Sequence, residues 1–246
     1  MKKIILTAFI AAGMLFTSCN DDDNTTPDNG TKVYLPVKMS GEDGSSVLFS
    51  YDNKGKVTSI VDSDDYKCTF TYSGDKLVKF SEISDSIETV YTFSQEGNTI
   101  TLNSSYEYNG QTYDNTGTIE VDENGNLLSD GLFSYTYDEA GNNVKIAVED
   151  KFEGGSTATM TFDTKNGFTK NLSLPKWLLN FLGYGTNAVN NMLTFDSVSE
   201  EYPEDNNSSV MSYEYNEAGY PIKMKVIGTD TSGTEEHTVT IEYTKK

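Results

Sequence analysis

The chain is short of the residues on which most enzymatic and nucleic-acid chemistry depends. Its 246 residues include no arginine, one histidine and two cysteines, and 38 acidic residues outnumber 18 lysines to give a formal charge of −20. An acidic chain without the bidentate arginine fork repels phosphate backbones, so we expect no nucleic-acid partner. Zinc needs three or four His or Cys ligands, and a Ser or Cys triad needs a histidine base beside a nucleophile turn, which is not recognisable here. The composition therefore predicts no metal, no cofactor and no enzymatic activity.

The N-terminus has the layout of an export signal. Two lysines precede an apolar stretch over residues 4–16 that is too short to span a membrane comfortably. The following run, LFTSC, resembles the lipobox of bacterial lipoproteins, with Phe16 where leucine is usual. We expect residues 1–18 to be a lipoprotein signal peptide and Cys19 to be the lipidated residue. An ordinary secretory signal with an incidental cysteine is the alternative.

The segment after Cys19 is polar and acidic. Residues 20–32 contain no apolar side chain beyond one proline, so they cannot offset the entropy of ordering, and we expect a disordered leash. The acidic run directly after Cys19 also looks like the surface-export signal of Bacteroidetes lipoproteins. These features predict a protein of the cell envelope held to the membrane by its N-terminal lipid, at the outer membrane or the cell surface. Residues 33–246 then form a single domain.

The strongest internal pattern is a repeated unit of two alternating aromatic or apolar residues, a polar turn with glycine, and a second apolar alternation. Alternation of period two places the aromatic residues on one face of a strand, and an Asp or Asn followed by Gly is typical of a tight turn. The units occupy residues 49–57, 70–77, 91–97, 119–127, 135–141, 160–167 and 213–222, and 241–243 is half a unit.

Successive hairpins with short connections predict an all-β fold, an antiparallel meander of about a dozen strands. So many strands do not remain in one flat sheet, and we expect the sheet to curl into an open or closed barrel. Cys68 shares strand parity with Tyr66, Phe70 and Tyr72, so it is predicted to be a buried core residue rather than a reactive thiol.

The units resemble the YD repeats of Rhs-type proteins, in which Tyr-Asp precedes a turn containing Asn-Gly. The pair is present at 51–52 and 137–138, but the arginine usual in those repeats is missing. Nearly the whole chain is similar to a Bacteroidetes lipoprotein family of uncharacterised function described as porin-like in fold. The shared features are the acidic leash, the hairpins and a Pro-Trp-Leu insertion before the final strands. This resemblance implies no catalytic residue.

The alternation fails between residues 168 and 202. The apolar run LPKWLLNFLG predicts one short helical insertion near 174–193, beginning at Pro175, with a further turn over residues 188–193. The segment either plugs the concave side of the sheet or forms part of a binding mouth. Any ligand is expected beside Trp177, Phe181 and Tyr184.

Clustered acidic residues are the remaining chemical signal. Residues 62–65 and 122–126 supply oxygen ligands, but neither follows the twelve-residue calcium loop, and turn formation explains them. Carboxylate pairs are unavoidable in so acidic a chain, so their number does not predict a glycosidase.

The sequence thus favours a non-enzymatic envelope protein with a binding or structural role, whose partner is a glycan or another envelope component. A carrier of apolar ligands in a half-open barrel and a glycan-active hydrolase are the alternatives.

Overall fold

A computed structural model describes residues 33–148, 155–182, 188–199 and 201–246. The predicted signal peptide, Cys19 and the leash lie outside these ranges. The described chain forms these strands and helices: β1 (Tyr34–Gly41), β2 (Ser46–Tyr51), β3 (Val57–Asp62), β4 (Lys67–Ser73), β5 (Lys76–Ser84), β6 (Ile87–Glu96), β7 (Thr99–Tyr108), β8 (Gln111–Val121), β9 (Leu127–Ser129), β10 (Phe133–Tyr137), β11 (Asn143–Val148), β12 (Ser156–Phe162), α2 (Lys176–Phe181), β13 (Met192–Ser199), the 3-10 turn η1 (Pro203–Asp205), β14 (Asn207–Tyr215), β15 (Pro221–Asp230) and β16 (Gly233–Lys245).

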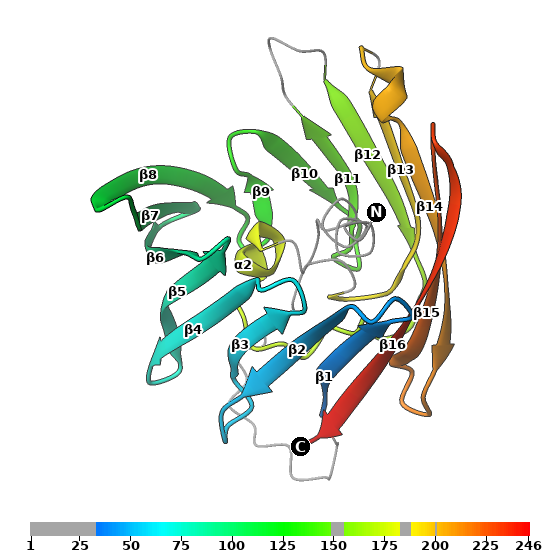
Figure 1. Cartoon of the computed structure of the whole chain (residues 1–246), viewed down its shortest axis with the longest axis horizontal. Coiled ribbons are helices and arrows are strands. Elements are labelled where there is room, and N and C mark those ends of the chain that lie inside the picture. Colours follow the sequence, from blue (N-terminus) through cyan, green and yellow to red (C-terminus); the bar gives the residue numbers. More distant parts are fainter. Residues whose placement is uncertain (1–32, 149–154, 183–187, 200) are drawn as a thin grey trace.

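The strands form one closed antiparallel barrel in which each strand pairs with its neighbours in the sequence (Figure 1). The exception is the pairing of β1 with β16, which closes the ring and brings Val33 and Lys246 into reciprocal backbone hydrogen bonds of 2.9 and 3.0 Å. The all-β meander is confirmed, and the sheet is closed rather than open. The described residues contain sixteen strands instead of about a dozen, because short pieces such as β9 are too brief to show an alternation.

A recurring turn ends the strands at one end of the barrel. In the turn after β2, Oδ1 of Asp52 accepts the backbone N–H groups of Lys54 and Lys56 at 2.8 and 2.9 Å. Gly55 takes φ +88°, a conformation that glycine adopts without strain and that strains residues with a Cβ atom. The same geometry follows at residues 122–126, 138–142 and 216–220. The glycine-containing turns were therefore predicted correctly.

The turn at the opposite end of β3 uses the same geometry without glycine. Oδ1 of Asp62 accepts the N–H groups of Asp64 and Tyr66 at 2.8 and 2.9 Å, and Asp65 occupies the glycine position at φ 66°. Turn formation thus accounts for both acidic clusters considered as calcium ligands. No group of three or more His, Cys, Asp or Glu side chains suited to a metal is present in the described ranges.

Tyrosine hydroxyls form hydrogen bonds between neighbouring strands at the end of the barrel that carries the glycine turns. Tyr51, Tyr137 and Tyr243 each donate to a backbone carbonyl of the preceding strand, at 2.6, 2.6 and 2.9 Å. Burial raises the pKa of each phenol well above its ordinary value. These three tyrosines therefore pack their rings inward while each hydroxyl pairs an otherwise unsatisfied carbonyl.

Most buried apolar side chains face the inside of the barrel, and the outer face is mainly polar with scattered exposed apolar residues such as Leu48 and Val210. Phe70 and Cys68 of β4 are buried, whereas Lys67, Thr69 and Thr71 alternate with them on the outer face. This confirms the predicted parity, and Cys68 is a fully buried thiol whose pKa is raised, chiefly by burial. Outward polar and inward apolar positions are the reverse of the arrangement that a lipid-facing barrel surface requires.

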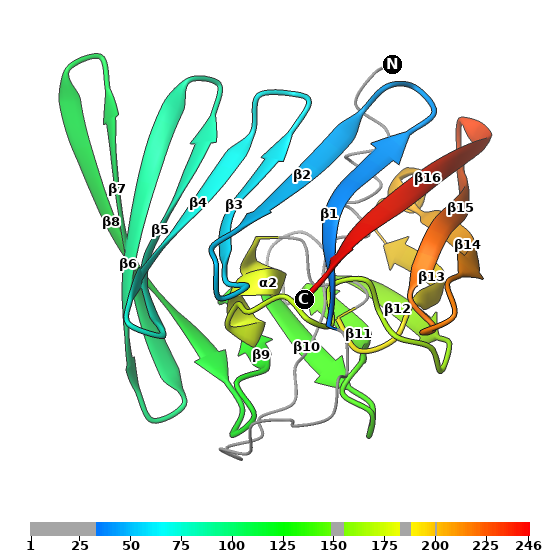
Figure 2. The ribbon, with the colours of Figure 1, turned by 90° about the horizontal axis from the view of Figure 1, so that it is seen from below.

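The connection between β12 and β13 enters the barrel and carries the helix α2 (Figure 2). The helix is shorter than predicted, spanning Lys176–Phe181, and Pro175 lies just before it rather than in its first turn. The further turn expected over residues 188–193 is wrong, because β13 already begins at Met192 and hydrogen-bonds to β12. None of the helices in the described ranges is long and apolar enough to cross a membrane.

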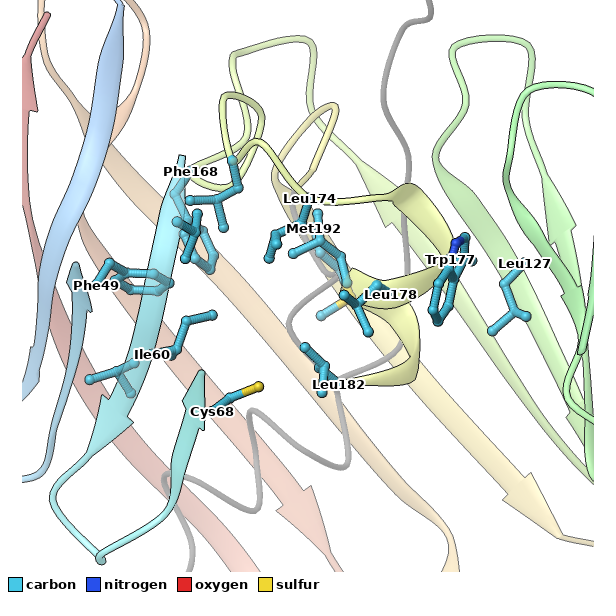
Figure 3. Packing of buried hydrophobic residues seen from close by; sticks show 14 of the residues in the cluster. Phe49, Ile60, Cys68, Leu127, Phe168, Leu174, Trp177, Leu178, Leu182 and Met192 are labelled. Carbon is cyan, nitrogen blue, oxygen red and sulfur yellow. The ribbon is translucent and has the colours of Figure 1, made fainter. Parts of the chain in front are cut away.

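The helix is packed on several sides. Figure 3 shows Leu178 and Leu182 directed toward Ile60 and Cys68, while Trp177 points to the other side of the barrel. Trp177 is 4% exposed and meets the ring of Phe93 edge-on at 5.1 Å. We call residues 168–182 the plug, because their apolar side chains occupy the interior of the barrel at the end that carries the glycine turns.

Candidate functional site

The inward side chains of the barrel change from buried to exposed across strands β4 to β8. Hydrogen-bonded register places Phe70, Phe80, Tyr91, Ser104 and Asn115 on one continuous inward line. The first two are buried, the next two are half-buried, and the last is exposed. The plug therefore covers the inner face beside β4 and β5. On β7 and β8 the inward residues Ile100, Leu102 and Ile119 are buried as well, and the inner face is in contact with solvent only from Ser104 and Asn115 toward the β7–β8 turn.

The exposed part of this face carries tyrosines. Tyr106 and Tyr113 pair directly across β7 and β8, and their rings stack with centroids 5.1 Å apart and planes at 12°. Tyr113 remains 39% exposed. Inward-facing aromatic rings in contact with water are a typical element of a binding surface. We define Tyr91, Ser104, Tyr106, Tyr113 and Asn115 as the tyrosine platform.

Phe181 connects the plug to the platform. Its ring meets Phe80 edge-on at 6.0 Å and Tyr91 at 5.8 Å, while Phe80 and Tyr91 stack at 4.5 Å. These contacts fix the side chain of Tyr91, the residue at which the closed part of the inner face meets the open part.

A carboxylate lies beside the platform on the same inner face. Glu82 of β5 is half-buried, and its Oε1 accepts the hydroxyl of Tyr66 at 2.6 Å. The pKa of Tyr91 is raised, first by burial and then by the charge of Glu82 and a hydrogen bond to it. Two phenol groups thus orient this carboxylate at the border of the platform.

Negative charge on this face has no cationic counterpart in the described residues. Asp62 of β3 also faces inward and is 7% exposed, and its Oδ2 has no hydrogen-bond partner. The described ion pairs involve neither Asp62 nor Glu82. The lysines of β3 to β8 lie on the outer face, at Lys67, Lys76 and Lys79.

The residues predicted to lie beside a ligand differ in their exposure. Trp177 is a core residue of the plug and is not accessible, whereas Phe181 is half-buried beside the platform. Tyr184 and the lipidation site Cys19 lie outside the described residues. The platform itself was missed, because Tyr106 and Tyr113 share the alternation of core aromatics and only the position of the plug leaves them uncovered.

These features define a plugged β-meander barrel whose inner face is covered beside the plug and is open and tyrosine-lined near the β7–β8 turn. No family model matches the chain. It is 31% identical over 191 residues to the tRNA3(Ser)-specific nuclease WapA of Bacillus spizizenii, a match that covers 76% of this chain and 6% of that protein. The chain thus spans a small fraction of this relative's length.

Solved structures resemble the chain at low identity. A porin-like protein from Bacteroides uniformis aligns over 87% of this chain and 98% of its own, with 13% identity and a TM-score of 0.47. The structure of TcdB2-TccC3-TEV aligns over 84% of this chain and 11% of its own, with 12% identity and a TM-score of 0.36. Neither likeness carries a function over to this chain.

Proposed function

We propose that the protein is a lipid-anchored, non-enzymatic binding protein of the cell envelope, and that its ligand binds at the tyrosine platform. The observation that carries this proposal is the division of the inner face. The part beside the plug is sealed, while the part near the β7–β8 turn presents Tyr106 and Tyr113 to solvent on the inside of the barrel. A barrel with only a structural role would gain from packing these rings as it packs the others.

The outer face supports a position outside the bilayer. Its strands carry Ser, Thr, Lys and Glu at alternate positions, as in β4 and β16. Such a surface is stable in water and costly in lipid. Membrane attachment is therefore assigned to the lipid on Cys19, and the barrel stands in the aqueous phase.

The two alternatives have less support from the geometry. A carrier of apolar ligands would need the apolar inner positions, which are the ones that the plug covers. A glycosidase of the usual kind needs two carboxyl groups facing the substrate. On the described inner face of β3 to β8 the carboxylates are Asp62 and Glu82, and that of Asp62 is buried and bound to turn amides.

The proposal is tested by localisation and by binding. Replacing Cys19 with serine should move the protein from the outer-membrane fraction to the soluble fraction, because the outward positions of described strands such as β4 and β16 are mainly polar. In a thermal-shift panel of neutral saccharides, ammonium compounds and carboxylates, at least one compound should raise the melting temperature, and Tyr113→Ala should abolish that rise. Mass spectrometry should then recover the bound compound unchanged. Turnover of a bound compound that Glu82→Gln abolishes would show an enzyme instead.

A further inference from the structure

The chemistry of the ligand follows from the charge of the open inner face, given the binding role proposed above. Glu82 is half-buried without an ion-pair partner in the described chain, and Asp62 adds a second inward negative charge. A carboxylate removed from water is costly unless a positive charge compensates it. An anionic ligand would increase this cost, and a cation would reduce it.

The aromatic residues lie where they can contact the same ligand. Glu82 pairs with Thr89, Thr89 with Tyr106, and Tyr106 with Tyr113, so the four residues form one inward line across β5 to β8. Neighbouring strands lie about 4.8 Å apart, which places Glu82 and Tyr106 about 10 Å from each other. Tyrosine faces attract organic cations through the ring quadrupole, most strongly where water is partly excluded.

We infer that Glu82 and the tyrosine platform together bind an organic cation that also carries a planar or apolar group. The ammonium group lies over Thr89, between the carboxylate of Glu82 and the ring of Tyr106, and the planar or apolar part extends toward the ring of Tyr113. The acidic character of the whole chain favours the approach of a cation from solution.

The test compares three probes of similar size on the full chain purified in a nonionic detergent. Benzyltrimethylammonium carries the charge and the ring, benzyl alcohol carries the ring alone, and benzoate reverses the charge. Saturation-transfer NMR and calorimetric titration should show that the ammonium probe binds at least about fivefold more tightly than benzyl alcohol, and that benzoate does not bind. Equal binding of the charged and neutral probes, or no binding of the ammonium probe, would overturn the inference.

Variants locate the site. Glu82→Gln keeps an acceptor for Tyr66 and should weaken binding of the ammonium probe about fivefold or more, as should Tyr113→Ala. Glu107→Gln is the matched control, because it removes the same charge from the outer face of β7 and should leave affinity unchanged. Urea unfolding of each variant separates loss of binding from loss of fold. If Glu82→Gln and Glu107→Gln behave alike, the inference is wrong.

The same variants separate this inference from the proposed function. Chitotriose serves as a neutral saccharide probe. If chitotriose binds, and its affinity falls in Tyr113→Ala but not in Glu82→Gln, the platform is a binding site but the cation assignment fails. If no compound of the panel depends on Tyr113, both fail.

Discussion

Replacing Leu178 with alanine tests whether the plug is a core element or a loosely held lid. Leu178 has no exposed surface and lies at the centre of α2 among the inward side chains of the barrel. The change removes about three carbon groups, worth roughly 0.8 kcal/mol each, and the cavity left behind adds up to about 2 kcal/mol. We expect the free energy of unfolding to fall by about 3–4 kcal/mol, a large part of the stability of an ordinary domain.

Trp177 makes this measurement direct, because it is the one tryptophan of the sequence and is buried next to the substituted residue. Urea unfolding followed by its fluorescence should show a midpoint lowered by at least about 1 M, given a typical slope of 1–3 kcal/mol per M. Leu132→Ala is the matched control, because Leu132 is 68% exposed. If Leu178→Ala lowers the midpoint no more than Leu132→Ala does, the plug does not pack as described.

Three further predictions concern the tyrosines and the turns. Burial and neighbouring charge raise the pKa of Tyr72 to about 12 and that of Tyr137 further. The neutral phenols therefore contribute their full stabilisation below about pH 10, and the melting temperature should fall as the pH rises from 10 to 12. Tyr137→Phe should lower the free energy of unfolding in urea by about 1–2 kcal/mol, because it leaves a backbone carbonyl unpaired, whereas Tyr113→Phe removes only an exposed hydrogen bond and should change it very little. Equal losses in the two variants would contradict the role of the buried hydroxyl. Asp65→Gly should raise stability by about 1 kcal/mol and Gly125→Asp should lower it by a similar amount, because both positions have positive φ; a destabilising Asp65→Gly would show that the aspartate is not strained there.

The fold was largely predictable because its information is local. Each repeat carries the alternation that sets the inward face and the Asp and Gly that set the turn, as at Asp52 and Gly55. Closure was not predictable to the same degree. It depends on the pairing of β1 with β16, which joins residues about two hundred positions apart and leaves no local pattern.

The candidate site was predicted only in part for the same reason. Phe181 is half-buried beside Tyr91, whereas Trp177 is sealed inside the plug, and binding at either residue stays a prediction. Tyr113 has the parity of a core residue, and its exposure follows from where the plug ends. A pattern along one strand reports which face a side chain occupies and does not report what covers that face.

The β1–β16 seam also determines when the barrel can become complete. Every other pairing joins neighbours in the sequence, so hairpins such as β7–β8 can form as soon as their strands exist. The seam must wait for the last strand in chain order, and closing a loop of that length costs about 5 kcal/mol of entropy that the earlier hairpins do not meet. Until then β1 presents an unpaired edge, at which a second chain could add a strand. The slowest step of folding, and the one most open to intermolecular error, therefore lies at the junction of the two ends of the domain.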